Sequence, residues 1–152
     1  MSHITAITLK IRGLDDLETA ATECGLELVR EQTTHKWYGR FVGDTAGIDG
    51  VAREEYGKCL HALRLPNAGP GDYEIGVCAA RDGDGFELRV DTWRQTRLLA
   101  AVGGADMPKL KQEYAIAVTK RRVGQTLARK GFVFAGREAL ANGRVRMLVR
   151  KR

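Results

Sequence analysis

Cys59 and His61 are the residues whose types and spacing come nearest to a chemical site. They lie two residues apart, and cysteine sulfur and histidine nitrogen are both ligands for zinc. Structural zinc sites combine two such close pairs, and this sequence supplies only one. A cysteine and a histidine can also act as nucleophile and base, but two side chains at i and i+2 of a strand share a face without bringing the sulfur onto the imidazole. We therefore keep a metal or enzyme site at these two residues as the third of three hypotheses, and we assign no catalytic residue and no cofactor.

The acidic and glycine-rich segments have simpler structural interpretations. Asp82 and Asp84 in RDGDGF resemble part of a calcium-binding loop, but the later ligands of an EF-hand are absent and a hairpin turn accounts for the same residues. The glycines of GDTAGIDG match neither phosphate-binding pattern, and the sequence contains no GxSxG or HExxH motif. None of these segments supports an enzymatic function.

Basic residues are concentrated in the last third of the chain. From Lys109 onward there are 13 Lys or Arg against 2 Asp or Glu, whereas residues 1–108 hold 12 against 17. On a helical wheel, residues 110–130 show a wide apolar arc and a narrow basic stripe, so we expect a helix that buries most of its circumference. The basic residues of this helix and of the last predicted strand are our candidates for contact with phosphate or another anion: Lys111, Arg122, Arg129, Lys130, Arg144, Arg146 and Arg150.

Binding of the nucleic-acid backbone through these residues is the second hypothesis. Positive charge alone gives weak association that depends on salt. No aromatic residue is interleaved with the basic ones to stack a base, and no known recognition motif accompanies them. The basic region therefore permits nucleic-acid binding without indicating it.

Hydrophobic periodicity and turn residues predict how these candidates are positioned. We expect first a strand, then a helix that Asp15 caps and Gly25 ends, and then a second strand or bent hairpin. These are followed by a hairpin around DGDG, a long helix from Asp106 to Gly131, and a last hairpin around Asn142 and Gly143. Residues 43–71 read as an irregular, loop-rich insertion with a short helical turn and a strand near Leu60 to Leu65. The order β-α-β, hairpin, α, hairpin predicts an α+β fold, with an antiparallel sheet of about five to seven strands and two main helices packed on it.

Length and composition limit the class of protein. The 152 residues, 43% hydrophobic and 29% charged, fit one globular domain spanning residues 1–152. The start MSHITAITLKIRGL lacks the features of a secretory signal, and the three cysteines suggest no disulfide framework. We expect a cytoplasmic protein with reduced thiols and no membrane segment.

Five segments occur in a familiar order: MSHITAITLKIRGLDDLETA, YEIGV, FELRVDTWR, LKQEYAIAV and NGRVRMLVRKR. Together they resemble the Ycf35-like family, also called the DUF1257 family, of cyanobacteria, algal plastids and other bacteria. The resemblance implies a small α+β protein and brings no established activity, cofactor or catalytic residue. Ser2, His3 and Trp93 are among the matching positions. A polar pair at a terminus has little reason to be distinctive for packing, so we expect Ser2 and His3, together with Trp93, to contact a partner.

The leading hypothesis is a non-catalytic accessory or adaptor protein that acts by binding a protein partner. It follows from the absence of catalytic motifs and from the charged surface expected on the sheet and the long helix.

Overall fold

The computed structural model describes residues 4–38 and 51–152. By internal packing the chain divides into two compact units, Met1–Tyr114 and Ala115–Arg152, which we call the sheet unit and the helix–hairpin unit. The described residues form α-helices and antiparallel sheets, so the predicted α+β class is confirmed. Among them, no helix is both long enough and apolar enough to cross a membrane.

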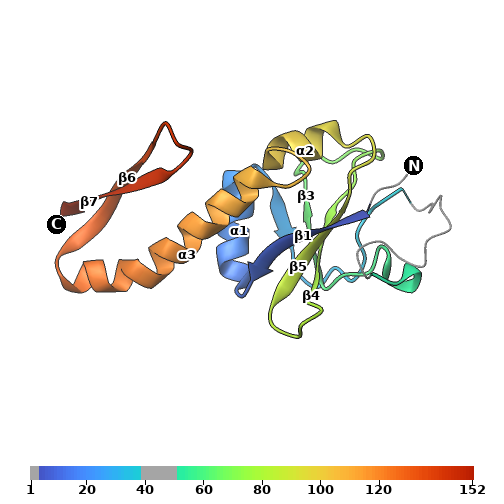
Figure 1. The fold of residues 1–152 in the computed structure, drawn as a ribbon, viewed down its shortest axis with the longest axis horizontal. Helices are drawn as coiled ribbons and strands as arrows, with labels where there is room; N and C mark the ends of the chain where they lie inside the picture. The colour runs from blue at the N-terminus through green and yellow to red at the C-terminus, as the bar shows by residue number, and fades with distance from the viewer. Residues whose placement is uncertain (1–3, 39–50) are drawn as a thin grey trace. The chain divides into compact units, whose positions relative to one another are not determined.

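The sheet unit contains a five-stranded antiparallel sheet in the order β1-β5-β4-β3-β2 (Figure 1). Its strands are β1 (Ile4–Ile11), β2 (Glu27–Val29), β3 (His61–Arg64), β4 (Ile75–Ala79) and β5 (Phe86–Asp91). The predicted hairpin around DGDG is present, with Val77 of β4 opposite Leu88 of β5. The strand expected near Leu60 to Leu65 is β3, and it pairs with both β2 and β4. A segment that reads as irregular in the sequence thus ends in an interior strand.

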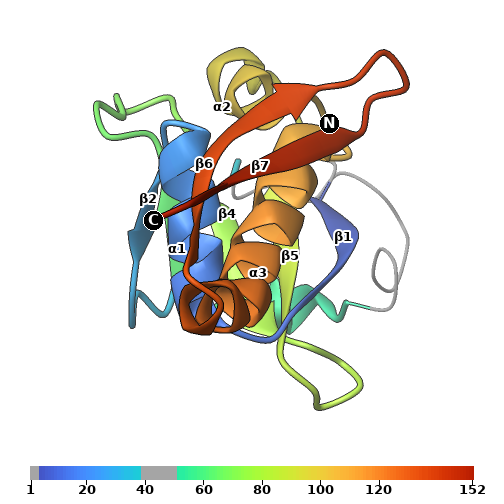
Figure 2. The ribbon, with the colours of Figure 1, turned by 90° about the vertical axis from the view of Figure 1, so that its left-hand side faces the viewer.

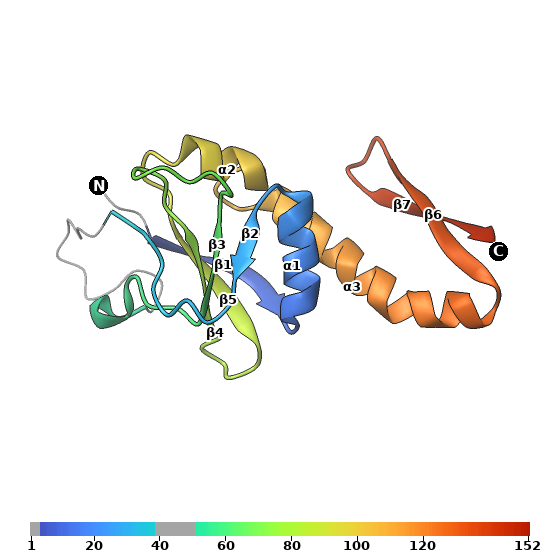
Figure 3. The same cartoon turned by 180° about the vertical axis from the view of Figure 1, so that it is seen from behind.

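One face of this sheet packs against helices. α1 (Leu14–Glu23) and the first turns of α3 (Pro108–Arg129) cover it, as Figures 2 and 3 show in two different views. The fully buried side chains of this core come from both layers: Leu17 and Ala20 of α1, Leu110 of α3, and Leu63, Ile75, Val77, Leu88 and Val90 of the sheet. Arg12 N–H also donates to the Tyr114 hydroxyl (2.9 Å), which ties the end of β1 to α3.

The helix ends show how local sequence acts. α1 is capped by Gly13, so the prediction of Asp15 as N-cap is wrong; Asp15 and Asp16 lie in the first turn, where negative charge favours a helix N-terminus. Gly25 ends the helix at φ 73°, the left-handed conformation that glycine adopts without steric cost. A short helix that we did not predict, α2 (Thr96–Val102), precedes α3.

The helix–hairpin unit contains the rest of α3 and the predicted last hairpin, β6 (Phe132–Ala139) and β7 (Val145–Lys151). The α3 residues from Thr119 to Arg129 are all exposed or half-buried. The prediction that this helix buries most of its circumference is therefore wrong for its second half. The reason is that few large apolar side chains follow Val118, and the hairpin meets this part of α3 where Phe134 lies against Gly124.

Candidate functional site

Cys59 and His61 are held in structural contacts. The Cys59 thiol donates to the Gln32 carbonyl (3.1 Å), and His61 Nδ1 accepts the backbone N–H of Glu31 (2.9 Å). Burial raises the pKa of Cys59 to about 12, so its thiol is protonated at neutral pH. Within residues 4–38 and 51–152, no group of three or more His, Cys, Asp or Glu side chains is placed to hold a metal ion. These contacts give no support to the hypothesis of a metal or enzyme site here.

The sheet face opposite the helices carries buried charge. Side chains alternate along the strands, so Gly76, Cys78, Arg89 and Asp91 share this face while their neighbours fill the helix-side core. Arg89 and Asp91 are almost completely buried, and Arg89 pairs with Glu87 at 2.8 Å. A buried charge is tolerated when hydrogen bonds or an opposite charge satisfy it. This face therefore depends on defined polar partners.

The segment Gln32–Tyr38, which we call the strap, lies over this face and is fastened to it by two buried carboxylates. Lys36 N–H donates to Glu74 Oε2 (2.9 Å), and Glu74 N–H returns a bond to the Lys36 carbonyl (2.9 Å). Farther along, Tyr38 N–H donates to Asp91 Oδ2 (3.1 Å). The start of the strap is also held by backbone pairing, since Thr34 forms an antiparallel bridge with Lys58. The carboxylates hold the rest, because a charged acceptor forms a strong bond to backbone N–H.

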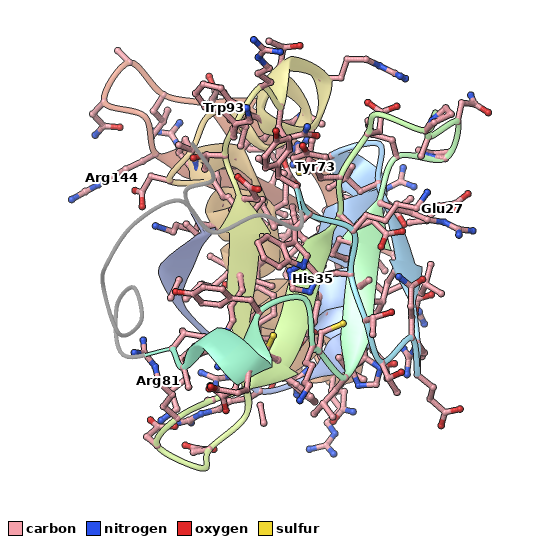
Figure 4. The ribbon with its side chains drawn as sticks, turned by 90° about the vertical axis from the view of Figure 1, so that its right-hand side faces the viewer. Glu27, His35, Tyr73, Arg81, Trp93 and Arg144 are labelled. Atoms are coloured by element: carbon pink, nitrogen blue, oxygen red, sulfur yellow. The ribbon has the colours of Figure 1, made fainter. Side chains whose placement is uncertain are left out.

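His35 of the strap lies at the centre of this face (Figure 4) and is 4% exposed. Its ring rests directly on Gly76: a Cβ at that position would lie 2.5 Å from His35 Nδ1. Neither ring nitrogen has a hydrogen-bond partner among the described residues. Burial lowers the pKa of His35 to about 4; the nearby Glu74 and Asp91 charges oppose this shift to a smaller extent, and the Arg89 charge adds to it. The imidazole is therefore neutral at physiological pH.

Trp93, one of the predicted partner contacts, is tied to the strap through Asp91. The Asp91 carboxylate accepts hydrogen bonds from Trp93 N–H (3.0 Å) and from Tyr38 N–H. Figure 4 labels Trp93 and Tyr73, both above His35 in that view. Arg94 has a left-handed backbone (φ 56°), and its guanidinium lies 5.4 Å from the centre of the Trp93 ring. Ser2 and His3, the other predicted contacts, lie outside the described residues.

The predicted basic candidates divide between the two units. Lys111 lies in the sheet unit, where it pairs with Asp106 at 2.9 Å and its side chain is 26% exposed. The other six lie in the helix–hairpin unit and are exposed: Arg122, Arg129, Lys130, Arg144, Arg146 and Arg150. This unit holds 11 Lys or Arg and one Asp or Glu, a net charge of +10. The basic surface is therefore a property of this unit, and Lys111 is not placed in it.

The helix–hairpin unit also exposes large apolar side chains. Val123 of α3 is 40% exposed, and Leu148 and Val149 of β7 are 42% and 45% exposed. Consecutive strand residues point to opposite faces, so Leu148 and Val149 expose apolar surface on both faces of the hairpin. Leu148 shares its face with Arg146 and Arg150, whereas Val149 lies opposite Phe134. The unit thus combines dense positive charge with apolar surface that its own fold does not cover.

Sequence reasoning found the basic residues and Trp93 but missed the strap and His35. The strap has no regular periodicity, and its partners Glu74 and Asp91 lie about 40 to 50 residues farther along the chain. The glycine at position 76 could have indicated that another group packs closely on β4, because a glycine inside a strand often marks such a close approach. Comparison with family models, curated proteins and solved structures found no match for the chain.

Proposed function

We propose that this protein is a non-catalytic adaptor of the cytoplasm that binds a protein partner through its helix–hairpin unit. The proposal includes the Ycf35-like resemblance, which brings no established activity, and it keeps Ser2, His3 and Trp93 as further partner contacts. The partner surface has the opposite character to that of the unit: acidic around an apolar centre.

The exposed apolar side chains Val123, Leu148 and Val149 carry this proposal. Protein interfaces combine an apolar centre with a polar rim. Leu148 and its neighbours on the same face of β7, Arg146 and Arg150, match this pattern, with the apolar side chain between the two charged ones. Burying a leucine of this kind contributes about 1.5 to 3 kcal/mol. The surrounding arginines add electrostatic attraction, which raises the rate of association with an acidic surface and selects against basic ones.

Nucleic-acid binding remains the second candidate because of the same arginines. The exposed apolar side chains of Leu148 and Val149 would make no favourable contact with the charged phosphates of a nucleic-acid backbone. Proteins that bind single strands also place aromatic rings among their basic residues. In this unit the aromatic Phe134 lies on the face opposite that of Arg146 and Arg150, and it packs against Gly124. The position of the apolar side chains therefore favours a protein partner.

A pull-down from lysate with matched variants separates the two candidates. The full chain is immobilised at about 50 mM and about 200 mM salt, and bound protein and nucleic acid are both identified. Leu148→Ser should weaken capture of the protein partner about tenfold at either salt concentration, because it removes apolar burial. Leu60→Ser, a change at a residue of similar exposure (45%) in the sheet unit, should leave capture unchanged.

Charge reversal completes the experiment. Arg122→Glu with Arg129→Glu should weaken capture mainly at the lower salt concentration, whereas Lys36→Glu with Lys58→Glu makes the same charge change on the sheet unit and should have little effect. If nucleic acid is captured at low salt, is lost at high salt and is indifferent to Leu148→Ser, the protein-binding proposal is wrong and the second candidate replaces it.

A further inference from the structure

The outer edge of β7 carries backbone groups that the hairpin does not use. At one end of the hairpin Leu140 N–H donates to the Arg144 carbonyl (2.8 Å), and at the other Arg152 N–H donates to the Gly131 carbonyl (2.8 Å). Bonded and non-bonded pairs alternate along an antiparallel ladder. Even-numbered residues of β7 therefore turn their amides toward β6. Val145, Met147 and Val149 turn N–H and C=O groups outward.

β7 is the regular edge of this hairpin and β6 is not. The register of β6 shifts by one residue between Phe134 and Gly136, which leaves Ala135 as a bulge. A bulge interrupts the row of backbone groups that a neighbouring strand would need. β7 has no such shift over its seven residues, and among the described residues it pairs only with β6. An additional strand would therefore fit beside β7.

The side chains of β7 specify what that strand should contain. Val145, Met147 and Val149 share one face, and Arg146, Leu148 and Arg150 share the other. Glu138, opposite Arg146 at 3.5 Å, is the one acidic residue in Ala115–Arg152. Residues directly opposite each other on adjacent strands interact, and opposite charges are favourable there. The complementary strand alternates acidic residues, facing the arginines, with apolar residues, facing Val145, Met147 and Val149.

We propose that the outer edge of β7 binds an extended acidic segment of a protein partner by strand addition. This inference rests on the proposed function and specifies how the helix–hairpin unit binds. Backbone bonds to the outward N–H and C=O groups of Val145, Met147 and Val149 supply affinity, and alternate side chains supply selectivity, as in other cases of strand addition. The edge is open and rich in positive charge, which also keeps copies of this chain from pairing with one another.

Met147→Pro and Met147→Ala are matched variants for testing the edge in the full chain. Proline removes an outward N–H and no hydrogen bond of the hairpin, and proline is tolerated on edge strands in this orientation. Alanine shortens the same side chain and keeps the N–H. The probe is a labelled synthetic peptide of about eight residues that alternates Glu and Val, long enough to pair along all of β7. A scrambled peptide of the same composition is its control.

Fluorescence anisotropy should show that the alternating peptide binds the wild-type chain about tenfold more tightly than the scrambled one. Met147→Pro should weaken binding about tenfold through the lost backbone bond, and Met147→Ala should change it by less than about threefold. Amide exchange followed by NMR provides a second readout on the wild-type chain. The peptide should slow exchange at Val145, Met147 and Val149, and leave the already bonded amides of Arg146 and Arg150 unchanged.

Equal affinity for the two peptides, or no added protection at the outward amides, would overturn strand addition. If Arg146→Glu with Arg150→Glu weakens peptide binding while Met147→Pro does not, the unit binds acidic protein by its side chains; the proposed function then stands and this inference fails. Binding of an oligothymidylate in preference to both peptides would overturn the inference and the proposed function together.

Discussion

Acidification should destabilise this protein through His35. The ordinary pKa of histidine is 6.5, and burial lowers that of His35 to about 4 in the folded chain. As the pH falls through 6.5, His35 becomes protonated in the unfolded chain but stays neutral in the folded chain. The stability that this group contributes is therefore complete above pH 6.5, declines as the pH falls, and is lost at about pH 4. The steepest part of the decline is about 1.4 kcal/mol per pH unit.

The two pKa values give the size of the effect. Between about pH 7 and about pH 4.5, single-site linkage predicts a loss of about 2 to 3 kcal/mol from the free energy of unfolding. That is a large part of the stability of an ordinary domain. The charged groups that face His35 are Glu74 and Asp91, which raise its pKa, and Arg89, which lowers it; each effect is smaller than that of burial, and all are included in the pKa of about 4.

His35→Phe isolates this contribution, because phenylalanine keeps a flat ring over Gly76 and does not titrate. Unfolding by urea, followed by the fluorescence of Trp37 and Trp93, gives the free energy of unfolding at a series of pH values. The difference in the free energy of unfolding between wild type and variant should change by about 2 to 3 kcal/mol across this range. His61→Phe shows what the loss of another imidazole does.

Parallel pH curves for the wild type and His35→Phe would refute the argument. They would mean that the imidazole finds a partner, or water, that supports its charged form. Direct titration of the His35 ring by NMR gives an independent answer. A midpoint near 6.5 would contradict the burial on which the reasoning depends.

Two further predictions concern the same face of the sheet. Gly76→Ala places a Cβ 2.5 Å from His35 Nδ1, so it should lower the free energy of unfolding, measured with urea, by about 2 kcal/mol. The control Gly71→Ala places a Cβ with no atom within 4 Å and should change the free energy of unfolding little. Equal effects of the two substitutions would contradict the close packing of His35 on Gly76. Burial raises the pKa of Cys59 to about 12 and that of Cys78 to about 11. Both thiols should therefore react with a disulfide reagent only after addition of urea. Fast reaction of these thiols in the native chain at neutral pH would contradict this prediction and show that this face of the sheet opens readily.

Local patterns predicted the parts of the fold that form from neighbouring residues. The hairpins at DGDG and at Asn142 and Gly143 were recognisable because the turn residues stand between alternating strands. The end of α1 at Gly25 was recognisable because the backbone there requires a left-handed residue.

Features that depend on distant partners were not predictable in this way. The strap is held by the side chains of Glu74 and Asp91 and by a backbone bridge to Lys58, and no local period marks a segment whose partners lie this far along the chain. The second half of α3 has few large apolar side chains, and periodicity does not show whether another element covers them. For the candidate site, the basic residues were found by counting charge. The outward row of backbone groups on β7 needed the register of the hairpin.

The position of β1 in the sheet has a consequence for synthesis of the protein. β1 lies at the edge, and its neighbour there is β5, with Ile7 opposite Leu88. During synthesis β1 must therefore wait for a partner about 80 residues behind it, which at typical rates of translation takes about 4 to 16 seconds. During that interval β1 lacks the strand with which it pairs in the folded sheet. The five-stranded sheet can therefore be completed only after synthesis has passed Asp91.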